Sequence, residues 1–307
     1  MFDPNNFIFL KIKPAAVHSI TPKAGILAML ASSLTFVPVR VHTFTGQVWA
    51  NKNGFSKILL KFFDFLIAKL ANFNFIDSHS QRDFLVKHKI LPLEKSIVFA
   101  NGSVSGVDLG KFKADRKVRN QIRRRLQIPY GAFIYLYLGR LNHDKGVLDL
   151  ASAFSKIKSK HAYLVVVGPD EAGISEQLKI FVGESRDKLR LVGFSNEPYQ
   201  YLAASDVLCL PSYREGFGSV IIEAAAMGVP AIASDIYGVS DAVQNRKTGL
   251  LHPPGDIDAI LKCMATFITN PRTVKIYGLA AKKRAISKFD SNILCKNWLR
   301  FYLDHLH

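Results

Sequence analysis

The chain has 307 residues, 49% hydrophobic and 21% charged, which suits a globular protein of two α/β domains and excludes one small domain. Its net charge of +17 favours an anionic partner, which could be nucleic acid, an anionic membrane face or a phosphorylated substrate. The longest apolar stretch, between Pro22 and Pro38, has about 15 residues and falls short of the ~20 that span a bilayer. Met1 to Pro4 lack the pattern of a signal peptide, so we expect a cytoplasmic protein.

Residues 1–125 alternate short apolar runs with helical patterns, which predicts a parallel sheet covered by helices. The predicted strands are Ala15–Val17, Val39–Val41, Phe75–Ile76 and Ile97–Phe99, and the predicted helices are Ala24–Leu34, Phe55–Leu70 and Gln81–Lys87. Four strands are few for a doubly wound domain. We therefore expect this first Rossmann-like domain to be incomplete.

Residues 126–288 show the same alternation more clearly and predict a second Rossmann-like domain. Its predicted strands are Phe133–Leu138, Tyr163–Val167, Leu189–Val192, Val207–Leu210 and Ala231–Ala233, and its predicted helices are Val147–Ile157, Ser219–Met227, Asp256–Ile268 and Pro271–Ser287. Residues 289–307 are expected to form a C-terminal helix that packs back on the first domain.

The segment from Lys111 to Arg125 joins the two predicted domains and is strongly basic, with Asp115 as its one acid. One interpretation is a solvated helix face beside the linker. The other is an electrostatic contact with anionic lipid head groups.

The segment from Pro211 to Pro230 carries the clearest chemistry, because an apolar strand runs through a glycine-containing turn into a helix that begins near Ser219. Gly216 and Gly218 allow a backbone to approach a ligand closely. The N–H groups and the dipole of the first helical turn suit a phosphate, and ligands of open α/β sheets bind at the carboxyl ends of strands. A third glycine is missing at Ile221, which argues against a dinucleotide-dependent dehydrogenase.

Two carboxylates, Glu215 and Glu223, are separated by seven residues across this turn. Carboxylates only accept hydrogen bonds, so they suit pairs of sugar hydroxyls at opposite ends of one ligand. The alternative is an ordinary surface glutamate and a glutamate favoured near a helix start by the dipole.

These residues resemble glycosyltransferase family 4, which has the GT-B fold of two Rossmann-like domains facing a cleft and a Glu-x7-Glu signature. The similarity extends to bacterial surface-polysaccharide members. The matching segments are Arg214–Gly218, Glu223–Pro230, Leu138–Leu141 with Lys145–Gly146, Val167–Pro169, Leu191–Phe194 and Asp206–Ser212.

The resemblance implies a role for each matching residue. Arg140 and Lys145 would neutralise the donor diphosphate and, with Glu215 on the transferred sugar, form the catalytic group; the alternative for both cations is an ordinary loop charge. Glu223 would bind the ribose of the donor. The backbone of Gly216, Phe217, Gly218 and Ser219 would hold the phosphates, and that of Gly193 and Phe194 would border the base.

The first domain departs from the family pattern in two ways. The position of a family histidine that faces the reacting sugar is occupied here by Thr45, next to Gly46, and these two are the candidate acceptor-side residues. His42 lies nearby and is interpreted as a core or edge histidine. Family members also begin with a further strand and a glycine-rich loop, so this N-terminus is expected to be shortened, as a truncated product, a compact variant or an inactive one.

The leading hypothesis is a retaining glycosyltransferase of surface polysaccharide or lipopolysaccharide synthesis. It would move a sugar, hexosyl or N-acetylhexosaminyl, from a nucleotide-sugar donor, expected to be UDP-linked, to a lipid-linked or saccharide acceptor. We expect no metal and no other cofactor, no nucleic-acid partner, and peripheral attachment to the anionic inner face of the cytoplasmic membrane. The alternative is a truncated, non-catalytic remnant that still binds the nucleotide sugar.

Overall fold

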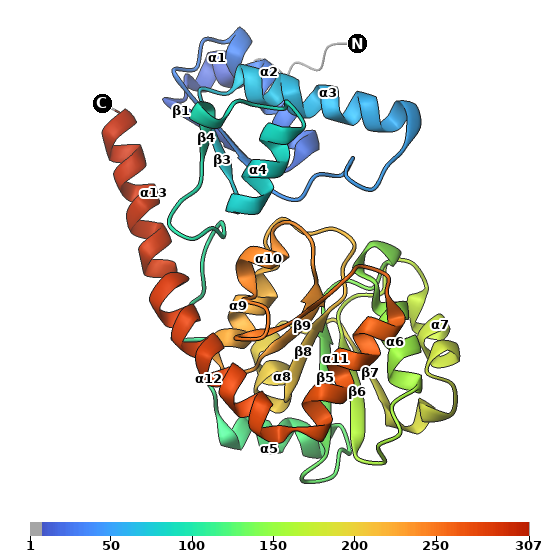
Figure 1. Cartoon of the computed structure of the whole chain (residues 1–307). Coiled ribbons are helices and arrows are strands. Elements are labelled where there is room, and N and C mark those ends of the chain that lie inside the picture. The colour runs from blue at the N-terminus through green and yellow to red at the C-terminus, as the bar shows by residue number, and fades with distance from the viewer. Residues whose placement is uncertain (1–7, 307) are drawn as a thin grey trace.

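The computed structural model describes residues 8–306 and shows two α/β units, each built on a parallel sheet (Figure 1). Met1–Pro4, examined above for a signal peptide, lie outside the described residues. Within that range no helix is both long and apolar enough to cross a membrane.

The first unit contains a four-stranded sheet in the order β1-β2-β3-β4. Its strands are β1 (Ala16–Ser19), β2 (Val39–Phe44), β3 (Phe73–Ile76) and β4 (Ser96–Ile97), and its helices are α1 (Ile8–Ile12), α2 (Pro22–Leu34), α3 (Gly54–Leu70) and α4 (His79–Lys87), with a 3₁₀ turn η2 (Leu93–Lys95). Because neighbouring strands follow one another in the chain and such crossovers are right-handed, α2, α3 and α4 cover the same face of the sheet. Met29 and Ile67 anchor α2 and α3 in the core on that face.

The second unit contains a six-stranded sheet in the order β10-β9-β8-β5-β6-β7. Its strands are β5 (Phe133–Leu138), β6 (Ala162–Val167), β7 (Leu189–Gly193), β8 (Val207–Leu210), β9 (Ala231–Ser234) and β10 (Gly249–His252). Its helices are α5 (Arg116–Arg125), α6 (Val147–Ser155), α7 (Ile174–Phe181), α8 (Pro198–Ala204), α9 (Ser219–Ala226), α10 (Val239–Ala242), α11 (Ile257–Thr269) and α12 (Pro271–Lys288), with 3₁₀ turns η3 (His143–Lys145) and η4 (Gly183–Lys188). The strand order reverses between β5 and β8, so the loops after these two strands border the crevice where such sheets bind ligands.

Helix α13 (Ser291–His305) leaves the second unit and lies along the first, as the red helix of Figure 1 shows. Trp298 and Phe301 pack on Val41 and Phe75, on the sheet face that α2 to α4 leave open. The hydroxyl of Tyr302 lies 2.7 Å from Nδ1 of His18 in β1. The last helix therefore completes the core of the first unit.

Most predicted elements are present within one to three residues, but one predicted strand is shorter than expected and several elements were not predicted. The strand predicted over Ile97–Phe99 is only the two-residue β4. No strand was predicted over β10, and no helix over α7 or α8. These elements carry no distinct apolar run, and β10 pairs with β9 alone.

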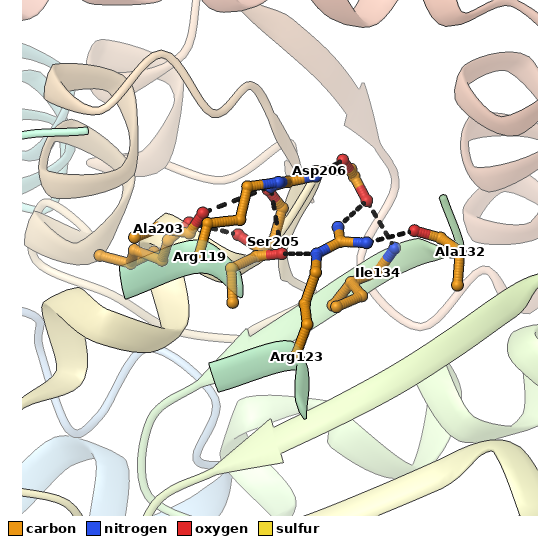
Figure 2. A network of polar contacts seen from close by, with 9 residues as sticks. Arg119, Arg123, Ala132, Ile134, Ala203, Ser205 and Asp206 are labelled. Atoms are coloured by element: carbon orange, nitrogen blue, oxygen red, sulfur yellow. Dashed lines mark hydrogen bonds and ion pairs between the residues drawn. The ribbon is translucent and has the colours of Figure 1, made fainter. Parts of the chain in front are cut away.

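The basic segment at the start of the second unit is not simply a solvated face. Figure 2 shows Arg119 and Arg123 of α5 converging on Asp206, with N–O distances of 2.6 and 2.8 Å. Arg123 also donates to the carbonyl oxygens of Ala132 and Ala204, and its side chain is only 6% exposed. These two arginines therefore join α5 to the strand ends opposite the ligand crevice.

Candidate functional site

The turn between β8 and α9 lies at the carboxyl edge of the six-stranded sheet. Gly218 begins α9 with a φ of +75°, a conformation that glycine adopts without strain. Ser219 is exposed at the first helical position, so the first N–H groups of α9 are directed out of the core. Phe217 is buried against Phe289, at a ring distance of 5.3 Å, which leaves only its backbone to contact a ligand.

Glu215 lies in this turn and is held by two side chains. The Nζ atom of Lys145 lies 2.5 Å from its Oε1, and Ser212 Oγ donates to the same oxygen at 2.9 Å. Lys145 ends the loop after β5, so the pair joins the loops on the two sides of the strand-order reversal. The side chains of Glu215 and Lys145 are 16% and 17% exposed, which leaves each with an accessible surface.

Glu223 lies about one turn into α9 and is half-buried. Burial raises the pKa of its carboxyl, and Lys111 opposes this effect. The two glutamates thus lie on either side of the start of α9, each with a cation near it. Among the described residues, Glu215 forms an ion pair with Lys145 alone, and Glu223 forms none.

The structure does not bring Arg140 to Glu215. Its guanidinium lies 3.2 Å from Glu171, and both side chains of that pair are about half exposed. An exposed ion pair of this kind contributes about 0–1 kcal/mol, so its replacement by a diphosphate costs little. The backbone at Arg140 is fixed independently, because its carbonyl accepts from the buried Tyr137 hydroxyl at 2.7 Å.

Gly193 and Phe194 lie at the end of β7, further along the same carboxyl edge. Gly193 has a φ of +77°, and the Phe194 side chain is 68% exposed. An exposed ring and an open backbone at this edge are available to a flat ligand such as a base.

The candidate acceptor-side residues, Thr45 and Gly46, directly follow β2 and meet the Glu215 loop. A Cβ atom on Gly46 would lie 2.8 Å from the backbone of Glu215 and Gly216, so the loop after β2 and the Glu215 loop are in backbone contact. Arg214 strengthens the contact by donating to the carbonyl oxygen of Gly46 at 3.1 Å. The carboxyl edges of the two sheets therefore face each other at the predicted site.

His42 is a buried histidine of the first unit. Its Nδ1 lies 2.8 Å from Ser19 Oγ, and its side chain is within the core. Burial, with a smaller contribution from His18, lowers its pKa to about 3. His42 is therefore neutral at ordinary pH and takes no part in the site.

Sequence reasoning missed Asp77, which follows β3 at the same edge. It is 7% exposed, its Oδ1 has no hydrogen-bond partner among the described residues, and a Cβ on Gly216 would lie 2.6 Å from its Oδ2. Burial raises its pKa to about 7, and the charge of Glu215 adds to this while a backbone hydrogen bond at Val104 opposes it. A carboxylate directly after a predicted strand was the available signal, since strand ends are where ligands bind.

Known proteins resemble the chain along most of its length. A family model described as Glycosyl transferases group 1 matches residues 118–284. The Staphylococcus aureus capsular polysaccharide biosynthesis glycosyltransferase CapM is 32% identical over 297 residues, which cover 94% of this chain and 76% of that protein. The Escherichia coli UDP-Gal:alpha-D-GlcNAc-diphosphoundecaprenol alpha-1,3-galactosyltransferase is 28% identical over 288 residues, which cover 91% of this chain and 73% of that protein.

Two solved structures share the arrangement of both units. Anabaena HepE in complex with UDP has a TM-score of 0.85 at 19% identity, over 98% of this chain and 82% of that one. The sucrose-phosphate synthase of Thermosynechococcus elongatus has a TM-score of 0.79 at 21% identity, over 97% of this chain and 75% of that one. The predicted GT-B fold is confirmed.

Proposed function

The chain belongs to the glycosyl transferases group 1 family and is a glycosyltransferase, and on this premise we propose that it moves a sugar from a UDP-linked donor to a lipid-linked or saccharide acceptor, with retention of configuration. The product would enter a bacterial surface polysaccharide or lipopolysaccharide. The observation that carries the proposal is Glu215, fixed by Lys145 and Ser212 beside the start of α9 and against the backbone of the other unit.

In the proposed donor site, each residue binds the part of the nucleotide sugar that its position can reach. Glu223 would accept hydrogen bonds from the ribose hydroxyls, because a half-buried carboxylate has few competing water molecules. The N–H groups at the start of α9 would hold the phosphates. Glu215 would accept from hydroxyls of the transferred sugar and keep it at the edge where the two units meet.

The proposed catalytic charges are cationic side chains rather than a metal. Lys145 and Arg140 would stabilise the negative charge that grows on the leaving nucleoside diphosphate. Lys145 would have to exchange part of its contact with Glu215 for the phosphate, and Arg140 would exchange Glu171 for it. We therefore expect transfer to continue at full rate after dialysis against a chelator.

The relatives support a lipid-linked saccharide as the acceptor. The Escherichia coli relative acts, by its name, on a diphosphoundecaprenol-linked sugar, and the Staphylococcus aureus relative belongs to capsular polysaccharide biosynthesis. A net charge of +17 suits a diphosphate-bearing acceptor and work at the inner face of the cytoplasmic membrane.

The donor site is tested by calorimetric titration with UDP, GDP and ADP. We expect UDP to bind best, and Glu223→Gln to weaken it about tenfold or more, since hydrogen bonds to a charged group are worth about 1.5–3 kcal/mol. Glu176→Gln, an exposed surface glutamate of α7, is the matched control and should bind as wild type does. If none of the three nucleotides binds, the donor site does not exist as proposed.

Transfer itself is tested with UDP-sugars and a lipid-linked acceptor, followed by release of UDP. Glu215→Gln should lose transfer while retaining UDP binding, because Glu215 contacts the sugar and not the nucleotide. Tight UDP binding without transfer or hydrolysis in the wild type would favour the alternative, a non-catalytic binding protein.

A further inference from the structure

Helix α3 exposes a continuous apolar stripe. Phe55, Ile58, Leu59, Phe62 and Phe65 follow one another at the three- and four-residue spacing of one helix face. Their exposed fractions run from 40% for Leu59 to 77% for Phe55. The opposite side of the helix carries its buried residues, Asp64, Ile67 and Ala68, so the stripe faces away from the core.

Helix α2, which contacts α3 on the same sheet face, has a second stripe. Leu27, Leu30 and Leu34 are exposed at 70%, 38% and 77%, and Phe36 after the helix is 88% exposed. Thirteen of the 25 large hydrophobic side chains that are exposed in the described part of the chain fall within residues 8–65. Such a concentration is larger than scattered surface hydrophobics and is typical of an interaction surface.

The charges around these stripes are all positive. Residues 8–76 contain seven lysines and one arginine but a single acid, Asp64. That acid is buried and accepts a hydrogen bond from the Trp49 indole at 2.7 Å, so it does not neutralise the lysines at the surface. The lysines are Lys11, Lys13, Lys23, Lys52, Lys57, Lys61 and Lys69.

The charges decide among the possible occupants of this surface. A second copy would bring two lysine-rich faces together, and an apolar peptide would leave the lysines unmatched. A bilayer with anionic head groups matches both features, since apolar side chains enter the acyl boundary while lysines contact the head groups. Figure 1 shows α2 and α3 at the end of the molecule opposite the six-stranded sheet.

We infer that α2 and α3 form the face by which this protein docks on an anionic membrane. The face also leads toward the site: Asn51, in the loop before α3, donates to the Tyr213 carbonyl next to the Glu215 loop at 3.1 Å. A lipid-linked acceptor held between the two units would therefore have its tail beside α3. This last step rests on the proposed function, whereas the docking face does not.

The inference is tested by floating the whole protein with phosphatidylcholine vesicles, with and without phosphatidylglycerol, over a salt series. The wild type should float with the anionic vesicles alone and detach as salt rises. The combined substitution Phe55→Ser, Ile58→Ser and Phe62→Ser should abolish flotation. The matched control, Ile180→Ser, Ile276→Ser and Leu279→Ser, removes equally exposed side chains on α7 and α12 and should float as wild type does.

Two single lysine substitutions form the second arm of the flotation experiment. Lys23→Gln and Lys69→Gln, at exposed lysines on the stripe faces of α2 and α3, should each lower vesicle binding about fivefold, since a lysine near an anionic surface is worth about 1 kcal/mol. Fluorescence of Trp49 and Trp298, which pack in the first unit, reports on the folding of each variant, and UDP calorimetry reports on the donor site separately from membrane binding. A wild type that does not bind UDP would contradict the proposed function and would leave the docking face unaffected.

Three results would overturn the docking face. The first is a wild type that stays with the soluble fraction in the presence of anionic vesicles. The second is a stripe variant that floats as well as the wild type. The third is a wild-type dimer in analytical ultracentrifugation that the stripe substitutions convert to a monomer, which would make the same face an interface between copies.

Discussion

Asp77 gives the sharpest test of the electrostatics at the junction of the two units. Its carboxyl is buried, and burial raises its pKa from the ordinary 3.8 to about 7. Between these values the unfolded chain has lost the proton while the folded protein keeps it, so the free energy of unfolding falls as pH rises through this window. Below pH 4 both states are protonated and the cost disappears.

The substitution Asp77→Asn keeps the size of the side chain and removes the ionisation. The difference between 3.8 and about 7, at about 1.4 kcal/mol per pH unit, corresponds to at most about 4 kcal/mol. We therefore expect the variant to be more stable than the wild type at pH 8 by up to that amount. The two should become equal near pH 4.

The assay is denaturant unfolding followed by tryptophan fluorescence at a series of pH values. The chain has two tryptophans, and both report on the first unit: Trp49 packs on Phe84, and Trp298 packs on Phe75, with ring distances of 5.2 and 4.5 Å. Asp83→Asn, an exposed carboxyl of α4, is the control and should leave the pH dependence unchanged. A wild type and an Asp77→Asn variant whose stabilities run parallel from pH 4 to pH 8 would refute the reasoning.

Gly238→Ala should abolish UDP-sugar turnover, because its Cβ would lie 2.0 Å from the carbonyl oxygen of Gly216 and displace the Glu215 loop. Gly173→Ala is the control: Gly173 has a similar positive φ, but no atom beyond its chain neighbours lies within 4 Å of the position that a Cβ would take, so the substitution adds backbone strain without a collision. An equal loss of turnover in Gly173→Ala would contradict the argument. Arg123→Met should lower the free energy of unfolding by about 3–5 kcal/mol in circular-dichroism denaturation, since it leaves a largely buried Asp206 without one of its cations. Arg124→Met, one residue along α5, should change it by less than about 0.5 kcal/mol, and equal effects would assign no special role to the network of Figure 2.

Local sequence patterns were sufficient for the strands in the middle of the six-stranded sheet. The runs Phe133–Leu138 and Val207–Leu210 coincide with β5 and β8, because a strand buried on both faces is a continuous apolar run with clear ends. The edge strand β10 lacks that signal, since two of its four residues are only partly buried. Its position is fixed by pairing with β9, which no short pattern records.

In the candidate site, too, the local features could be predicted from the sequence, and the contacts between distant residues could not. The turn from Glu215 to Glu223 is local, so its sequence identified the helix start and both carboxylates. The ion pair of Glu215 with Lys145 joins residues 70 positions apart, and it exists because β5 and β8 are neighbours in the sheet. The opposite orientation of Arg140, toward Glu171, and the burial of Asp77 depend on loop packing that residue types alone do not specify.

The contact between the two units has a consequence for how specificity can arise. Gly46 and Gly216 approach so closely that a Cβ on either would meet the backbone of the other loop, at 2.8 and 2.7 Å. The loop that carries Glu215 is thus positioned by the first unit as well as by its own sheet. A sugar bound to Glu215 would then be placed relative to Thr45 and Asp77 by backbone contact, without a flexible side chain between them. Glu215, proposed to hold the donor sugar, and the loop after β2, proposed to border the acceptor, are held at one separation by this contact. Changes in the loop after β2 should therefore alter the choice of acceptor and leave the nucleotide affinity unchanged.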